Sequence, residues 1–458
     1  MASSSSSVSP NPRRPLHAHA FSGPLIAPIP EQLDGVTADY LSLVLKANNV
    51  ISPGASISSV TETVLGVGTG FNSNTSLFKI NYTYEGGRPP PDPDAPHTNP
   101  PVLVVKSMPP AEETMVPPFL LARIFKAEVA TLITLGDKVS PTGTQFPVCF
   151  YAALRKGETR NVGIIIMAMV EAPYAAPRAG TQYVSLSIPH ARAGILNLAR
   201  FHAHFWVGDS KDPAKAIAEK FPETGRHFRS ITERETGLTV RYLLETGSFE
   251  DILALPEFAP IHGLTRMYAQ KSLAIVRELR KGPYSMSHGD VKKDNFFFVE
   301  EGQPGADEKA ALCDFQLATI CSPVRDLAYY IVLCLGVEER REHLPGLVKC
   351  YCAELKKNGI DFSEEQVLRD LPKWLLWPLL MDCATATGTR KECESYRGKQ
   401  ERGESVTDEE AKLYDRHEVF RQRAFAAIED FDVEAIVSRL GNDCGVPFMG
   451  CCCYWALK

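Results

Sequence analysis

The chain of 458 residues is 44% hydrophobic and 23% charged, and its formal net charge is −6. This composition is typical of a globular protein that buries a large core. The charge shows no basic excess, which argues against nucleic acid as a partner. The best apolar stretch, Leu327 to Val337, is too short to span a bilayer, so no membrane span is expected.

The two ends of the chain differ in composition from the rest. The first twenty residues are rich in serine, contain Arg13 and Arg14 and lack acidic residues, so residues 1–30 are interpreted as a disordered tail or, alternatively, an organellar transit peptide. Residues 441–458 form a cysteine-rich tail whose adjacent thiols suit one tetrahedral ion poorly. Most other cysteines are single, which is typical of buried thiols in a reducing compartment. This pattern favours a cytoplasmic location, unless the first residues target the protein to an organelle.

Residues 31–170 predict a small N-lobe in which strands dominate. Thr37 can cap a helix, because apolar residues follow it at three- and four-residue spacing. A second helix is predicted over Phe119–Leu135. The insertion at 85–101 is too rich in proline for a packed element and separates the second and third strands. Strands are predicted at residues 60–65, 75–84, 102–106, 145–154 and 161–169.

A glycine-rich segment lies between the first two of these strands. It contains Gly66, Gly68 and Gly70, with Thr69 and Ser73 beside them. Glycines let backbone amides approach phosphates and the two hydroxyls could add donors, so the segment is expected to bind a nucleotide. A glycine-rich hairpin without a ligand has the same pattern, and the position of this segment ahead of the other elements favours the nucleotide.

Lys106 and Glu128 are the charged residues of interest in the N-lobe. A lysine at the end of a buried strand needs a partner for its charge, and nucleotide phosphates are the natural one, although the side chain of Lys106 could also reach solvent. Glu128 follows 22 residues later on the second predicted helix. It could point inward and pair with Lys106, or it could be an ordinary surface glutamate.

Residues 171–440 predict a larger C-lobe that is mainly helical, and its central motif contains Asp290, Lys292 and Asn295. Asn295 precedes a buried strand and Asp314 follows a second one, so pairing of these strands would bring Asn295 and Asp314 together. A phosphoryl-transfer site requires this set, with Asp290 facing the acceptor hydroxyl and the other two side chains holding Mg²⁺ against the phosphates of ATP. The short strands are predicted at 296–299 and 310–313, and helices at 193–206, 261–280, 344–357, 363–387 and 409–440.

These motifs resemble the aminoglycoside phosphotransferase and choline kinase superfamily, in particular its CHK kinase-like, or ecdysteroid kinase-like, branch. The resemblance rests on His288-Gly289-Asp290 with Asn295 five residues on, followed by Asp314-Phe315-Gln316. It implies an α+β, bilobal protein-kinase-like fold, with an antiparallel sheet and one key helix in the N-lobe and a larger, mainly helical C-lobe. It also implies ATP and Mg²⁺ as cofactors.

The resemblance implies roles for further residues. Lys292 occupies the place where protein kinases carry a lysine that touches the transferred phosphoryl group. Met169 and Glu171 fall at the hinge that would contact the adenine ring. His202 would pack behind the catalytic loop, and Asp326 would accept hydrogen bonds from the backbone of that loop.

Only eleven residues separate Asp314 from Asp326, too few for the regulated activation segment of a protein kinase. The expected function is therefore ATP-dependent transfer of a phosphoryl group to a hydroxyl group of a small molecule. A protein kinase and a catalytically silent nucleotide-binding scaffold are the alternatives, and the acceptor and the oligomeric state stay open. Trp374, Trp377 and Met381 could line an apolar acceptor pocket in which Asp382 favours a cation, or the aromatic residues could belong to the core.

Overall fold

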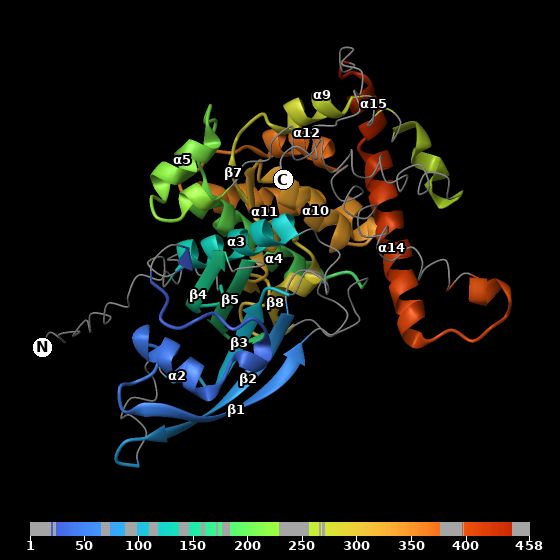
Figure 1. Cartoon of the computed structure of the whole chain (residues 1–458). Coiled ribbons are helices and arrows are strands. Elements are labelled where there is room, and N and C mark those ends of the chain that lie inside the picture. The colour runs from blue at the N-terminus through green and yellow to red at the C-terminus, as the bar shows by residue number, and fades with distance from the viewer. Residues whose placement is uncertain are drawn as a thin grey trace, which may run out of the picture.

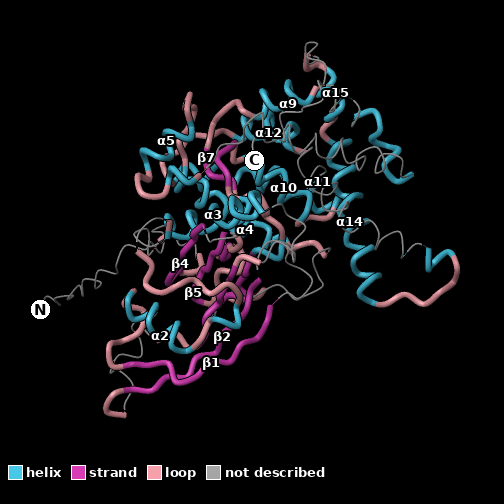
Figure 2. Tube along the Cα trace, in the orientation of Figure 1, coloured by secondary structure: helices cyan, strands magenta, loops and turns pink. Residues whose placement is uncertain are grey.

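The computed structural model of the protein has one part dominated by strands and a larger part dominated by helices (Figures 1 and 2). This arrangement confirms the predicted α+β fold with two lobes. None of the helices in the described ranges combines the length and the apolar character that a bilayer crossing requires. The structure describes residues 20–21, 24–65, 74–87, 99–109, 118–136, 146–156, 161–170, 173–175, 184–228, 256–264, 267, 271–375, 396 and 398–441.

The N-lobe is built on a five-stranded antiparallel sheet with the order β1-β2-β3-β5-β4. Its strands are β1 (Ala55–Leu65), β2 (Asn74–Tyr84), β3 (Val102–Ser107), β4 (Cys149–Lys156) and β5 (Asn161–Ala168). β1 begins earlier than predicted, because buried Ala55 and Ile57 already alternate with an exposed residue. β3 is the central strand, and Lys106 lies opposite Thr75 of β2 and Ile165 of β5. The sheet therefore fixes the backbone of Lys106 from both sides.

Helices α2 (Ala38–Ala47) and α3 (Pro118–Leu135) cover opposite faces of this sheet. Successive side chains of a strand point to opposite faces, so Ile164 packs in the cluster of α2 whereas Ile165 packs in the cluster that contains α3. The α3 cluster continues into the C-lobe, and Figure 1 shows α3 between the strands and the other helices. The hydroxyl of Thr37 accepts a hydrogen bond from the Tyr40 N–H, which confirms the predicted cap of α2.

The C-lobe surrounds a long buried helix, α4, which packs against α11. A Cβ on Gly194 of α4 would lie 2.2 Å from the Tyr330 hydroxyl, so α4 and α10 approach closely at this glycine. The helices are α4 (Ile188–Phe205), α5 (Pro213–Lys220), α9 (Ser272–Leu279), α10 (Val324–Leu333), α11 (Val337–Lys357), α12 (Glu364–Trp374), α14 (Asp408–Asp430) and α15 (Val433–Ser438). Short 3-10 turns lie at Leu33–Gly35, Gly225–His227, Pro256–Ile261, Lys293–Asn295 and Phe315–Leu317.

Short strands near the centre of the molecule position the loops of the C-lobe. β8 pairs with both β6 and β9, and β7 pairs with β10, all in antiparallel fashion. The loop that follows β7 and the segment that follows β9 thereby start from fixed strands. The bounds are β6 (Tyr174–Ala175), β7 (Ser285–Ser287), β8 (Phe296–Val299), β9 (Ala310–Leu312) and β10 (Thr319–Cys321).

Two long helices predicted for the C-lobe have different outcomes. Within the predicted helix 261–280, residues 262–264, 267 and 272–279 are helical, and at Lys271 the N–H donates to the Met267 carbonyl while the carbonyl accepts from the Ile275 N–H, both at 2.9 Å. The predicted helix 409–440 is α14 followed by α15, because Asp432 adopts a left-handed conformation with φ 47° and caps α15 through its side chain. In this second case local capping overrode a periodic apolar pattern.

Part of the segment predicted as a disordered or targeting tail is packed against the body of the protein. Ala20 is fully buried, and its carbonyl oxygen accepts a hydrogen bond from Arg155 of β4 at 2.8 Å. The ring of Phe21 lies 3.8 Å from that of His227 and 5.9 Å from the ammonium of Lys126 on α3. Phe21 thus contacts α3 of the N-lobe and the 3-10 turn of the C-lobe at once.

Candidate active site

The hairpin of β8 and β9 brings Asn295 and Asp314 to the same place. Phe296 pairs with Leu312 in this hairpin. Just beyond that pair, the backbone N–H of Cys313 donates to the carbonyl oxygen of Asn295 at 3.0 Å. Asn295 and Asp314 therefore lie at the same end of the two strands, as their spacing predicted.

The carboxylate of Asp290 is held mainly through one of its two oxygens. Oδ2 accepts hydrogen bonds from the Lys292 ammonium at 2.9 Å and from the Asn295 amide at 3.0 Å. Among the described residues, Oδ1 is contacted only by the hydroxyl of Tyr329, at 3.4 Å. Oδ1 is therefore the oxygen that can accept a proton from a ligand. The charge of Asp290 raises the pKa of Lys292, which keeps that ammonium protonated.

Lys106 reaches from the N-lobe to two carboxylates. Its Nζ lies 2.6 Å from Oε1 of Glu128 on α3 and 3.0 Å from Oδ1 of Asp314. Lys106 is 9% exposed and Glu128 is 1% exposed, so the ion pair expected from the sequence is present and buried. Because Asp314 belongs to the C-lobe, the same ammonium joins the two lobes at the site.

These three charged groups shift one another's pKa values. Burial alone would lower the pKa of the Lys106 ammonium, but Asp314 and Glu128 raise it above its usual range. Burial would raise the pKa of Asp314, but the ammonium groups of Lys106 and Lys292 lower it. Burial raises the pKa of Glu128 in spite of its ion pair. The two ammonium groups therefore favour the ionised form of Asp314, which is the form that binds a cation.

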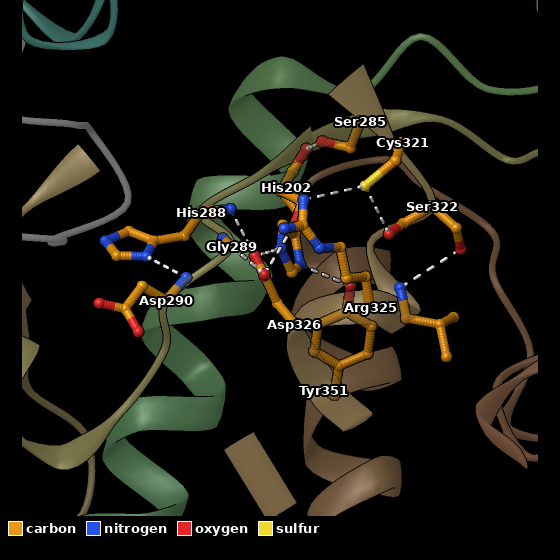
Figure 3. Close-up of polar contacts among 12 residues, drawn as sticks. His202, Ser285, His288, Gly289, Asp290, Cys321, Ser322, Arg325, Asp326 and Tyr351 are labelled. Atoms are coloured by element: carbon orange, nitrogen blue, oxygen red, sulfur yellow. Dashed lines mark hydrogen bonds and ion pairs between the residues drawn. The ribbon is translucent and has the colours of Figure 1, made fainter. Parts of the chain in front are cut away.

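The buried carboxylate of Asp326, at the start of α10, holds the loop that precedes Asp290 (Figure 3). Its Oδ1 accepts hydrogen bonds from the Ser287 hydroxyl at 2.6 Å and the Gly289 N–H at 2.9 Å. Its Oδ2 accepts from the His288 N–H at 2.6 Å and from the His202 ring at 3.0 Å. The predicted acceptance of backbone hydrogen bonds by Asp326 is confirmed, and His202 lies behind the loop as expected.

Two buried histidines extend this arrangement. Nδ1 of His202 lies 2.8 Å from the Tyr351 hydroxyl on α11. Nδ1 of His288 accepts the backbone N–H of Asp290 at 3.2 Å, so its proton is on Nε2, which donates to the Cys313 carbonyl at 2.8 Å. Burial lowers the pKa of His288, in agreement with a neutral ring. This ring fixes the backbone of the loop relative to β9.

Gly289 is the position in this loop where only glycine fits. Its φ is +86°, in the left-handed region that side chains rarely adopt. A Cβ would also lie 2.4 Å from the carbonyl oxygen of Leu317 and 3.0 Å from Nη2 of Arg325. The loop is therefore pressed against the segment that follows Asp314.

The side chains of Asn295 and Asp314 present oxygens that suit Mg²⁺. The Asn295 amide nitrogen donates to the carbonyl oxygen of Asp290, and Oδ1 of Asp314 accepts hydrogen bonds from Lys106 and from Gln316. Within the described residues, Oδ1 of Asn295 and Oδ2 of Asp314 have no hydrogen bond. One amide and one carboxylate oxygen fit an ion that takes its remaining ligands from phosphates and water. Across the described ranges no group of three or more His, Cys, Asp or Glu side chains could hold a metal alone.

Several predicted site residues lie outside the described residues, and their roles stay predictions. These are Gly66, Gly68, Thr69, Gly70, Ser73 and Glu171 of the nucleotide site, and Trp377, Met381 and Asp382 of the suggested acceptor pocket. Met169 follows β5 and is 42% exposed, so it is accessible to a ligand. Trp374 is 2% exposed and packs in the main core, which favours the core interpretation for this residue.

Two residues at the site received no role in the sequence analysis. Tyr329 contacts Asp290, and Gln316 donates its amide N–H to Asp314. Helical spacing could have identified Tyr329, because it lies three residues after Asp326 on α10 and so shares its face. Gln316 belongs to the motif Asp314-Phe315-Gln316, but the motif alone does not show which group its amide contacts.

A family comparison matches most of this region. The model of the ecdysteroid kinase-like family matches residues 76–361, which is more than half of the chain. The matched range begins in β2 and ends after α11, and it includes every residue described above around Asp290, Asp314 and Asp326. A search of curated proteins found no significant match.

Solved structures with similarity to the chain share little sequence with it. One, provisionally named an aminoglycoside phosphotransferase, is from Ralstonia eutropha JMP134; it is 12% identical with a TM-score of 0.44, covering 85% of this chain and 98% of that one. The microcompartment-associated aminopropanol kinase is 13% identical with a TM-score of 0.44, covering 88% and 99%. Aminoglycoside-3′-phosphotransferase of type VIII is 16% identical with a TM-score of 0.33, covering 70% and 94%.

Proposed function

Because the chain belongs to the ecdysteroid kinase-like family, it is a small-molecule kinase, and we propose that it transfers the γ-phosphoryl group of ATP to a hydroxyl group of its substrate. The observation that carries this proposal is the convergence of Asp290, Asn295 and Asp314 at one end of the β8–β9 hairpin. Lys106 reaches the same point from the N-lobe. Such a set supplies a base, two cation ligands and a phosphate-binding ammonium.

Asp290 acts as the base in the proposed reaction. Its Oδ1 accepts the proton of the substrate hydroxyl while the substrate oxygen forms a bond to the γ-phosphorus. The bond from that phosphorus to the bridging oxygen breaks, and its electron pair leaves with ADP. Lys292 and Asn295 hold Oδ2, so the carboxylate keeps its orientation while Oδ1 receives the proton.

Asn295 and Asp314 would hold Mg²⁺, and Lys106 would bind the phosphates. The cation supplies charge neutralisation between the phosphate oxygens when it is bound. Glu128 keeps the Lys106 ammonium charged and aimed at the site through the 2.6 Å contact. The Gly66 to Ser73 segment would cover the phosphates, and Met169 and Glu171 would contact the adenine ring.

The segment after Asp314 supports a small acceptor over a protein. It consists of the turn Phe315–Leu317, strand β10 and the start of α10, and β10 is paired with β7. Each part of this segment belongs to a turn, a paired strand or a helix of the fold. The segment therefore offers no extended surface on which a peptide could bind. The catalytically silent alternative is disfavoured because the base and both cation ligands are present.

The test is transfer of label from γ-labelled ATP to a pool of small hydroxyl compounds, with a generic protein mixture in parallel. We expect label in a small molecule, and Asp290→Asn should lower the rate about 10³-fold while equilibrium binding of ATP is retained. Asp307→Asn is the matched control, because Asp307 pairs with Arg192 on the surface and its side chain is 54% exposed. Label in the proteins would indicate a protein kinase. Full transfer by Asp290→Asn would refute the role of Asp290, and binding without any turnover would indicate a scaffold.

A further inference from the structure

We propose that Gln316 is a positioning residue that orients Asp314 for the nucleotide-bound cation. This inference rests on the proposed function and adds a residue to which that function assigned no role. Gln316 lies two residues after Asp314, and its Nε2 donates to Oδ1 of the Asp314 carboxylate. The contact leaves Oδ2 as the oxygen for the cation.

The backbone of Asp314 does not fix its own side chain. Asp314 has φ 66° and ψ 67°, a left-handed conformation that few residues other than glycine adopt. It precedes the turn Phe315–Leu317, but its carboxylate does not cap that turn. The direction of the carboxylate therefore depends on the groups that donate to it, which among the described residues are Lys106 and Gln316.

Both donors bind the same oxygen, but they differ in what they do when the nucleotide arrives. Lys106 also has to bind the phosphates in the proposed reaction. Phosphate oxygens would therefore replace at least part of its contact with Asp314. Gln316 belongs to the same short loop as Asp314 and has no such second task. Its hydrogen bond can persist through the exchange and keep Oδ1 occupied.

The chemistry of the side chain also suits this role. A neutral amide donates a hydrogen bond without cancelling the negative charge of Asp314, which the cation requires. A lysine or arginine at 316 would neutralise the carboxylate, and a glutamate would repel it. Removing a residue that hydrogen-bonds to a metal ligand typically changes the affinity for the metal by ten- to a hundredfold.

The test measures the Mg²⁺ concentration needed for half-maximal binding of a non-hydrolysable ATP analogue at equilibrium. Gln316→Met keeps the length of the side chain and removes its donor, and we expect it to raise that concentration about tenfold. Binding of the analogue in the presence of a chelator should be unchanged, because Lys106 and Glu128 are intact. Gln303→Met is the control, since Gln303 is exposed in the loop between β8 and β9.

The outcomes separate this inference from the proposed function. If the wild-type protein transfers phosphoryl groups and Gln316→Met has an unchanged Mg²⁺ requirement, the inference is wrong and the function stands. If the wild-type protein binds no ATP analogue at any Mg²⁺ concentration, the proposed function fails first. Should Gln316→Met not fold, as judged by thermal unfolding, Gln316→Ala removes the same donor without added bulk, and the same criterion applies to it.

Discussion

Asp326 and Lys106 lie on opposite sides of the candidate active site and hold their neighbours by different kinds of interaction. Asp326 is fully buried and accepts four hydrogen bonds, three of them from the loop that precedes Asp290. Lys106 makes two ion pairs, and one partner, Asp314, has a side chain that is 26% exposed. The side proposed to face the acceptor is thus fixed by buried hydrogen bonds in the structure without a ligand. The side proposed to bind the nucleotide is held by charges that a triphosphate could replace.

The largest expected effect comes from removing the acceptor of the buried hydrogen bonds. Asp326→Ala leaves two backbone N–H groups, the Ser287 hydroxyl and the His202 ring without their partner in the core. We expect a loss of about 3–5 kcal/mol in the free energy of unfolding, measured in urea. Asp307→Ala, on the surface, should change that free energy by less than about 0.5 kcal/mol. Similar values for both variants would contradict the role of Asp326 in holding the loop that precedes Asp290.

Lowering the pH tests the same comparison, because the pKa of Asp326 lies below that of an ordinary aspartate. Burial alone would raise it, but hydrogen bonding by His202 and the electrostatic influence of His202, His288 and Arg325 lower it to about 2. A carboxyl with a lower pKa in the folded state stabilises the fold above its unfolded pKa of about 4, and loses this contribution as the pH falls toward 2. The contribution is about 2 kcal/mol.

Urea unfolding of the wild type and of Asp326→Asn from pH 6 down to pH 3 measures this contribution. The free energy of unfolding of the wild type should fall more steeply with acid than that of the variant. Parallel curves would show that Asp326 does not titrate as its hydrogen bonds imply.

The smallest effect on stability is expected on the nucleotide side. Glu128→Gln removes one charge from the Lys106 cluster, but Asp314 still pairs with the ammonium. The free energy of unfolding should change by about 1 kcal/mol or less. Lys106 would be less firmly aimed at the phosphates, so the dissociation constant for ATP should rise about tenfold. Calorimetric titration with ATP checks this, and a large loss of stability without a change in affinity would assign Glu128 to the fold alone.

The sequence predicted the elements whose signals are local. Thr37 caps α2 as expected, and the distance of 22 residues between Lys106 and Glu128 anticipated their ion pair. The β8–β9 hairpin was predicted from two short apolar runs that flank an acidic loop, and its pairing places Asn295 beside the segment that leads to Asp314. The cap and the hairpin follow from residue types at a fixed spacing, whereas the sequence left the pairing of Glu128 open and the structure decided it.

The features that were missed depend on contacts between distant segments or on single side chains. A periodic apolar pattern continued across Asp432, although its left-handed backbone ends one helix and caps the next. The role of Gln316 depends on where the Asp314 carboxylate points, which its hydrogen bonds with Lys106 and Gln316 decide. The packing of Ala20 depends on Arg155, far along the chain. Local sequence patterns carry no information about such partners.

The contacts of Phe21 have a practical consequence for work with the protein. Its ring bridges Lys126 of α3 and His227 of the C-lobe, and α3 also carries Glu128. A purification tag or fusion partner joined just ahead of Ala20, or cleavage after Phe21, would act on the helix whose Glu128 holds Lys106, the residue proposed to bind the phosphates. Preparations that differ only at this end can therefore differ in their affinity for ATP.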